Sequence, residues 1–205
     1  MRRGKPTTWV TYGEDMATLA GDALIVEAFS VIASEMAKIH NPSLILRYAK
    51  ALDVLAKKTG MQGMIGGQVV DVQKTGEKLN EEELDFIYRL KTGALLEASF
   101  MIGAIVGGAK QEEIDVMEEI ARNIGMAFQI QDDILDETST EEELGKPIHS
   151  DERNVKTTYV TLYGLNKAKD EVLRCSTEAQ RLLDTIQGDT SVLKKMIVWL
   201  SMRRK

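Results

Sequence analysis

An acidic ridge near the middle of the chain has the clearest chemical potential in this sequence. Asp132 and Asp136 continue, at four-residue spacing, an apolar helical stripe that runs over residues 114–128, while Gln129 precedes Asp132 by one turn and Asp133 flanks it. Carboxylates at this spacing repel one another and are costly to bury alone, so a bound cation is the economical explanation. Oxygen ligands with no histidine or thiolate nearby favour a hard ion such as Mg²⁺, completed by water and a phosphate.

The alternative for these acids is a plain helix end or a solvated face. Short acidic strings recur by chance, so an isolated DDxxD pattern leaves the two explanations about equally balanced. The rest of the sequence shifts that balance, because three further motifs place polar or charged residues where a helical core is expected.

The first of these motifs is a pair of glycines inside a helical pattern. Gly66 and Gly67 each cost roughly 1 kcal/mol relative to alanine, which indicates a close backbone approach to a neighbouring helix or to a ligand. Gln68 and Asp71, three residues apart, would share one face of that helix. Taken alone, the motif is better explained by small-residue packing with an exposed Asp71.

The other two motifs supply positive charge. Lys91 enters the most apolar helical segment and requires a phosphate oxygen, an inward carboxylate or a path to solvent along its alkyl stem. The loop that follows the acidic ridge returns Lys146, Asp151 and Lys156, although without the ridge it would be a solvated loop. A basic arm at residues 2–5 precedes the first helix.

Helices must position these residues, because no segment alternates apolar and polar residues cleanly enough to predict a strand. The three prolines, at positions 6, 42 and 147, fall where helical patterns pause. We therefore predict one all-α domain over residues 1–205. The expected helices cover residues 13–38, 43–59 with Ser43 as the cap, 62–74, 81–106 after an Asn80 cap, 111–136, 155–187 and 190–203.

Composition limits the function and the location. The chain has 26 Lys and Arg against 32 Asp and Glu, a net charge of −6, which argues against a nucleic-acid binder. The single Cys175 has no disulfide partner and, with His40 and His149, makes a poor zinc set, so we expect a cytoplasmic protein. The apolar segment 93–109 contains Glu97 and falls short of the ~20 residues of a membrane span, so no span is expected.

Six strings, taken in order, resemble the trans-isoprenyl diphosphate synthases, especially the bacterial short-chain type that includes farnesyl diphosphate synthase (geranyltranstransferase). They are RRGKPT at 2–7, LAGDAL at 19–24, GMIGGQVVD at 63–71, KTGALLEAS at 91–99, FQIQDDILD at 128–136, and GK, SD and KTTY within 145–159. The resemblance implies an all-α, isoprenoid-synthase-type helical bundle with a deep central cavity, usually a homodimer. It also implies Mg²⁺-dependent condensation of an allylic diphosphate, geranyl or dimethylallyl, with isopentenyl diphosphate to farnesyl or a similar short-chain diphosphate.

The resemblance also implies roles for individual residues. Metal binding, direct or through bound water, falls to Asp132, Asp133, Asp136, Asp71 and Asp151. Substrate binding falls to Arg2, Arg3, Gln68, Lys91, Phe128, Lys146 and Lys156. The catalytic set, which stabilises the leaving diphosphate and lines the path of the carbocation, comprises Lys91, Thr92, Gln129 and Lys146. No histidine base is required, because the released diphosphate can accept the proton.

One departure from the family concerns its first aspartate-rich motif, which precedes RRGKPT and is absent from this sequence. We therefore interpret the chain as the C-terminal portion of a polyprenyl synthase and expect little or no condensation activity from the isolated 205 residues. Exposed apolar surface should also make it associate. The alternatives are a catalytically inactive short homologue that acts as an interaction or regulatory subunit, and a terpene cyclase. The lysines and carboxylates favour the enzyme over the former, and GGQVVD, KTGALL and the paired arginines argue against the latter.

Overall fold

The computed structural model describes residues 5–139 and 156–203, with the side chains of residues 201 and 202 left aside. Arg2, Arg3, Lys146 and Asp151, which the family resemblance selected, lie outside the described residues. Within them the chain forms helices and no strand, so the all-α prediction is confirmed. The helices are α1 (Thr8–Tyr12), α2 (Glu14–Met36), α3 (Pro42–Thr59), α4 (Met64–Gln73), α5 (Glu81–Ile87), η1 (Tyr88–Gly93), α6 (Ala94–Gly107), α7 (Gln111–Thr138), α10 (Tyr159–Tyr163), α11 (Leu165–Leu183) and α12 (Ser191–Met202).

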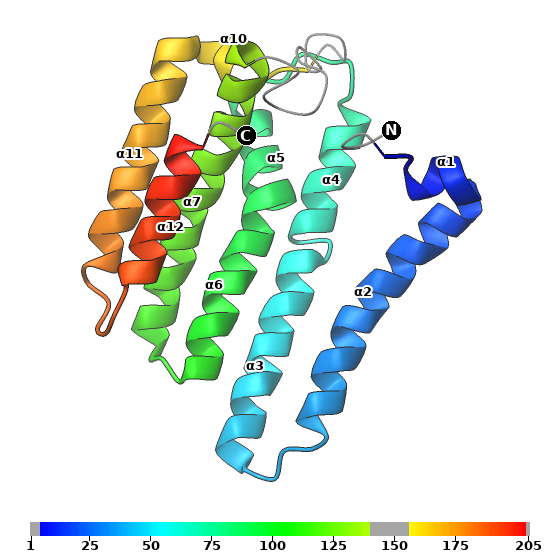
Figure 1. Cartoon of the computed structure of the whole chain (residues 1–205), viewed down its shortest axis with the longest axis vertical. Coiled ribbons are helices and arrows are strands. Elements are labelled where there is room, and N and C mark those ends of the chain that lie inside the picture. The colour runs from blue at the N-terminus through cyan, green and yellow to red at the C-terminus, as the bar shows by residue number, and fades with distance from the viewer. Residues whose placement is uncertain (1–4, 140–155, 204–205) are drawn as a thin grey trace.

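The bundle is organised around α7, which packs mainly against α6 on one side and α11 on the other. In Figure 1 α2 lies at one edge, followed by α3 and α4, while α11 and α12 lie at the opposite edge. Ile120 and Ile130 of α7 and Leu183 of α11 are fully buried and anchor the two clusters of apolar side chains along this contact. Because these long helices pack along their length, the end of the bundle where the predicted site residues lie is held in a fixed arrangement.

Local signals explain most helix boundaries, with two corrections. Asn41, rather than Ser43, caps α3, because its side chain accepts hydrogen bonds from the Ser43 and Leu44 amides while Pro42 takes the first helical position. The helix predicted over residues 155–187 is two helices, α10 and α11. Gly164 separates them with φ of +83°, a backbone conformation that glycine adopts without strain.

The helix predicted over residues 81–106 is confirmed in extent but contains an unexpected turn of π-helix, η1. Asn80 caps the start of α5 as predicted, and it forms a reciprocal capping box with Glu83. The π turn then interrupts the α-helical pattern at Tyr88–Gly93, the segment that carries Lys91 and Thr92. Such turns occur frequently at functional sites, because they change the direction of side chains along an otherwise regular helix.

α2 differs from the other long helices because none of its residues is buried. Leu19, Leu24 and Val26 are 59%, 73% and 66% exposed. The helix was predicted correctly, and its open apolar side chains agree with the expectation of exposed apolar surface. α2 and the continuous stretch 81–107 are long and apolar enough to cross a membrane by length and composition. Buried core helices pass that same test, so it does not establish a span.

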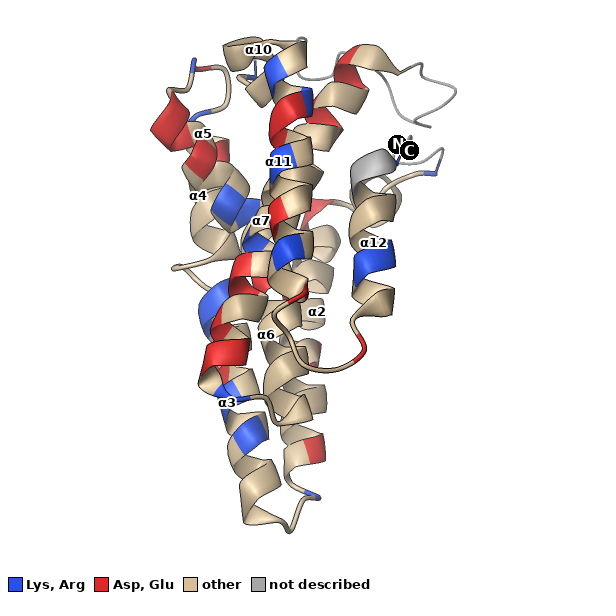
Figure 2. Ribbon diagram, turned by 90° about the vertical axis from the view of Figure 1, so that its left-hand side faces the viewer, with Lys and Arg blue, Asp and Glu red and all other residues tan. Residues whose placement is uncertain are grey.

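Charged residues are distributed differently on the two edges of the bundle. Figure 2 shows bands of both signs along α11, where Arg174 pairs with Glu171 and Arg181 with Glu178. The charged residues of α2 are all acidic and few for its length. The α11 edge therefore has the mixed charge of a solvated surface, whereas the α2 edge is mainly apolar.

Candidate active site

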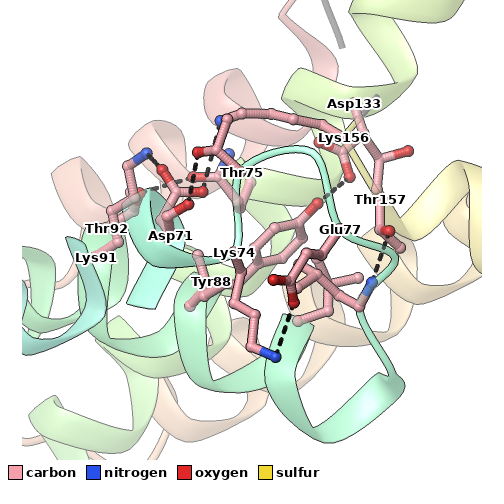
Figure 3. Close-up of a pocket in the computed structure, with 15 residues that line it drawn as sticks. Asp71, Lys74, Thr75, Glu77, Tyr88, Lys91, Thr92, Asp133, Lys156 and Thr157 are labelled. Atoms are coloured by element: carbon pink, nitrogen blue, oxygen red, sulfur yellow. Dashed lines mark hydrogen bonds and ion pairs between the residues drawn. The ribbon is translucent and has the colours of Figure 1, made fainter. Parts of the chain in front are cut away.

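Asp71, Lys91 and Lys156, which we call the site cluster, meet at one end of the bundle. Lys91 donates a hydrogen bond of 2.5 Å to Asp71 Oδ2, and Lys156 forms an ion pair of 3.5 Å with Oδ1 (Figure 3). Burial would raise the pKa of Asp71, but the hydrogen bond from Lys91 and the charge of Lys156 outweigh it and hold that pKa below its ordinary value. Asp71 is therefore a carboxylate between two ammonium groups.

Gly67 explains how α4 brings Asp71 to Lys91. A Cβ at this position would lie 2.4 Å from the backbone nitrogen of Lys91 and 2.8 Å from Cβ of Leu90. Only glycine permits this approach of α4 to η1. The sequence left two explanations open for the glycine pair, close approach to a neighbouring helix or to a ligand. At Gly67 the structure supports approach to the neighbouring helix.

The site cluster borders a small pocket of about 90 Å³. Its lining residues come from α4, the segment between α4 and α5, α5, η1, α7 and the segment before α10: Asp71, Lys74, Thr75, Glu77, Leu79, Leu84, Ile87, Tyr88, Lys91, Thr92, Gln129, Asp133, Lys156, Thr157 and Thr158. This volume has room for a few water molecules. A larger anion would have to draw the two lysine ends away from Asp71, and the half-exposed lysine side chains are free to follow it.

Thr92 and Gln129, predicted as a pair along the reaction path, are in direct contact. The Thr92 hydroxyl donates to the Gln129 side-chain carbonyl at 2.7 Å, which joins η1 to α7. Both residues line the pocket. Two polar oxygen groups thus lie beside the lysines, in a position where they could face a developing positive charge.

Asp133 is held by two groups that the sequence did not single out. The Tyr88 hydroxyl donates to Asp133 Oδ2 at 2.5 Å, and the backbone amide of Tyr159 donates to the same oxygen at 2.9 Å. The carboxylate is buried and connects η1, α7 and the start of α10. Tyr159 ends the KTTY string, but nothing in the sequence indicates that its amide is the group used.

The acidic ridge is buried only partly as the apolar stripe predicted. Asp136 is buried as predicted, whereas the Asp132 side chain, also predicted inward, is 36% exposed. Asp133, predicted at the flank, is buried as well, because the donors from Tyr88 and Tyr159 lie on its side of α7.

Asp132 instead pairs with a residue that sequence reasoning missed, Arg203. The Arg203 Nη2 atom lies 2.5 Å from Asp132 Oδ1, and the guanidinium carbon lies 3.7 Å from the centroid of the Phe128 ring. The sequence shows only that Arg203 is a charged residue that follows an apolar helix. That pattern does not indicate which other helix Arg203 contacts.

Gln68, predicted to bind substrate, is exposed and does not line the pocket.

The predicted metal ligands do not form a complete site by themselves. Among the described residues no three acidic, histidine or cysteine side chains form a group disposed to hold a metal. Asp132 and Asp136 lie one helical turn apart on α7, and their carboxylate oxygens suit Mg²⁺. They fit part of a magnesium site whose remaining ligands would be water and phosphate.

Comparison with known proteins places this geometry in a family. The family model described as "Polyprenyl synthetase" matches residues 1–197. The chain belongs to the polyprenyl synthetase family. The match runs through every helix that borders the pocket and through most of α12, so the bundle and the candidate site both lie within the region shared with the family.

Three relatives illustrate what this chain is similar to. It is 42% identical over 193 residues to a farnesyl diphosphate synthase of Geobacillus stearothermophilus, covering 94% of this chain and 64% of the relative. It is 45% identical over 185 residues to a chloroplastic geranylgeranyl pyrophosphate synthase of Capsicum annuum, covering 90% and 49%. A geranyltransferase from Helicobacter pylori, solved with magnesium and isoprenyl diphosphate, has a TM-score of 0.79 at 32% identity, covering 97% and 63%. The chain thus spans about half to two thirds of these relatives.

Proposed function

We propose that this chain is part of a Mg²⁺-dependent prenyltransferase that condenses an allylic diphosphate with isopentenyl diphosphate. The observation that carries the proposal is the site cluster beside the contact between Thr92 and Gln129. It combines two cations that suit a diphosphate with polar oxygens that suit a carbocation. Membership of the polyprenyl synthetase family supports this chemistry.

In the proposed reaction Lys91 and Lys156 bind the diphosphate of the allylic substrate. The diphosphate oxygens replace Asp71 as partners of the ammonium groups, and Asp71 stays close enough to limit how far the lysines move. As the allylic carbon–oxygen bond breaks, the lysines stabilise the negative charge on the leaving group. Thr92 and Gln129 present oxygen atoms toward the positive charge that remains on the allyl group.

Asp132 and Asp136 would hold the magnesium ion, which supplies further neutralisation of the diphosphate charge. Their spacing on α7 places both carboxylates on one face near the end of the helix. Asp133, fixed by Tyr88 and Tyr159, orients this end of α7. The predicted roles of Phe128 at the isopentenyl group, and of Arg2, Arg3, Gln68, Lys146 and Asp151, remain part of this proposal.

We further propose that residues 1–205 form one helical domain, corresponding to the C-terminal portion of such an enzyme, that acts as a homodimer in the cytoplasm. The open apolar face of α2, with Leu19 and Leu24 exposed, is suited to pack against a second copy or against another part of the protein. Cys175 is buried and unpaired, which suits a reducing compartment. For the product we propose farnesyl or a similar short-chain diphosphate.

The proposed function is tested with the complete protein, Mg²⁺, labelled isopentenyl diphosphate, and geranyl or dimethylallyl diphosphate as the allylic substrate. We expect a labelled prenyl diphosphate, whose chain length identifies the product. Asp132→Ala should lower the rate far more than it lowers the midpoint of thermal unfolding. No product with either allylic substrate, from a folded protein, contradicts the proposal.

A further inference from the structure

Arg203 is fixed to a single turn of α7 by four separate contacts. Its Nη2 atom donates to Asp132 Oδ1 at 2.5 Å and to the Phe128 carbonyl oxygen at 3.1 Å. Its guanidinium lies over the Phe128 ring, and its own carbonyl oxygen accepts a hydrogen bond of 3.4 Å from the Gln131 side chain. The side chain is only 11% exposed. The end of α12 is therefore docked on the helix turn that carries Asp132.

The docked guanidinium is not fully satisfied. Its Nε atom is buried and has no hydrogen-bond partner among the described residues. A buried donor without a partner opposes the docked state, because it has lost its water without a replacement. The contact with Asp132 thus supplies much of the favourable interaction that keeps Arg203 in place.

The surroundings allow this residue to leave without disturbing the core. Arg203 also borders an open groove of about 720 Å³ between α11 and α12, together with Lys195 and Trp199. Trp199 is 66% exposed, whereas Ile197, on the other side of α12, is buried in the apolar cluster with α7 and α11. Undocking of the Arg203 side chain would therefore break its contacts with α7 and leave the packing of Ile197 in place.

We propose that Arg203 is the resident counter-ion of Asp132, and that binding of magnesium and diphosphate displaces it and releases the C-terminal segment from α7. The inference rests on the proposed function only in taking Asp132 as a metal ligand. A divalent cation and a guanidinium on one carboxylate repel each other at a few ångströms, so each weakens the binding of the other. By linkage, removal of Arg203 must strengthen metal binding by the factor by which the metal weakens docking.

The first test is calorimetric titration of the complete protein with magnesium pyrophosphate. Arg203→Ala should bind about five- to tenfold more tightly than the unchanged protein, because it removes a charged competitor. Arg181→Ala is the matched control, since it deletes an arginine from an exposed pair with Glu178 on α11, and its affinity should not change. An affinity of Arg203→Ala equal to or weaker than that of the unchanged protein overturns the inference.

The second test is hydrogen exchange at the end of α12, residues 199–203. Magnesium pyrophosphate should accelerate exchange in this segment, and Asp132→Asn should accelerate it without any ligand. Unchanged or slower exchange on binding overturns the inference but leaves the proposed function standing. If no magnesium pyrophosphate binds at all, the inference and the metal role of Asp132 fail together.

Discussion

Among the charged side chains that join helices in the described part of this bundle, two clusters differ in charge balance. The site cluster has one carboxylate, Asp71, between two lysines and borders a pocket. The second, which we call the clamp, consists of Lys58, Glu97, Glu118 and Arg122 and joins α3, α6 and α7. Lys58 pairs with Glu97 and, at 2.6 Å, with Glu118, while Arg122 Nε lies 3.4 Å from Glu97.

The clamp is balanced in charge and built around a buried acid. Its two acids neutralise its two bases, and Glu97 is only 3% exposed, although Arg122 at the rim is 47% exposed. The site cluster has an excess of positive charge on two partly exposed lysines beside a pocket, so it can bind an anion. The comparison teaches that an ion pair within a helical bundle indicates a binding site when its charges are unbalanced and it borders a pocket, and a structural contact when its charges are balanced around a buried acid.

The largest predicted difference between substitutions in the two clusters is in catalytic rate. Lys91→Ala should lower kcat about a hundredfold or more, because it removes a cation that stabilises the leaving diphosphate. Its unfolding free energy should change by less than about 1 kcal/mol, since Lys91 is half-exposed. Steady-state kinetics and chemical denaturation of the same preparation measure both quantities.

The matched control for Lys91→Ala is Lys57→Ala, which breaks an exposed pair with Asp53 on α3. It should leave both kcat and stability nearly unchanged. A similar loss of activity in the two variants would mean that Lys91 acts only through the surface charge of the bundle.

The next effect concerns the clamp and should be on stability. Glu97→Ala should destabilise the fold by about 2–3 kcal/mol, because it leaves Lys58 and Arg122 to share the single carboxylate of Glu118. The activity of the molecules that remain folded should be preserved. Denaturation midpoints compared with those of Asp53→Ala, an exposed acid on α3, isolate the effect of burial, and equal midpoints would contradict the structural role of the clamp.

The smallest effect is the pH dependence, which should have opposite directions in the two clusters. The pKa of Asp71 is below 3.8, so its contribution to stability is present above about pH 4 and is lost as the pH falls through the lowered value. Burial lowers the pKa of Lys58, but the hydrogen bonds that it donates to Glu118 and Glu97 raise that pKa above 10.5. Its contribution to stability is therefore present below that pH and is lost as the pH rises further.

Thermal unfolding of Asp71→Asn and Glu97→Gln from pH 3 to pH 11 checks these directions. The difference between Asp71→Asn and the unchanged protein should shrink toward the acid end. The difference for Glu97→Gln should shrink at the alkaline end. If both differences were constant with pH, neither carboxylate would interact with its lysines as the structure shows.

The sequence was sufficient to predict the helices and the close approach at Gly67, because both depend on local periodicity and on residue size. It was also sufficient to select Asp71, Lys91, Thr92 and Gln129, which do meet at the pocket. Asp71, Lys91 and Gln129 stand out because they are polar residues within helical patterns, whereas Thr92 was selected by the family resemblance.

The sequence was not sufficient where the outcome depends on contacts between distant segments. The π turn at Tyr88–Gly93 has no local signature, and it lies at the helix turn that delivers Lys91. The inward direction of Asp133 depends on a tyrosine hydroxyl 45 residues away, and the partner of Asp132 lies 71 residues further along. Periodicity alone assigns a face to a residue but does not identify the donors on that face.

The central claim, that the site cluster binds diphosphate, is tested most directly by the affinity of the complete protein for magnesium pyrophosphate, measured by calorimetry. Lys91→Ala should weaken binding at least about tenfold, whereas Glu97→Gln, measured at a temperature where it is folded, should bind as the unchanged protein does. If Lys91→Ala binds normally, or if Glu97→Gln weakens binding as much as Lys91→Ala does, the distinction between the two clusters is wrong.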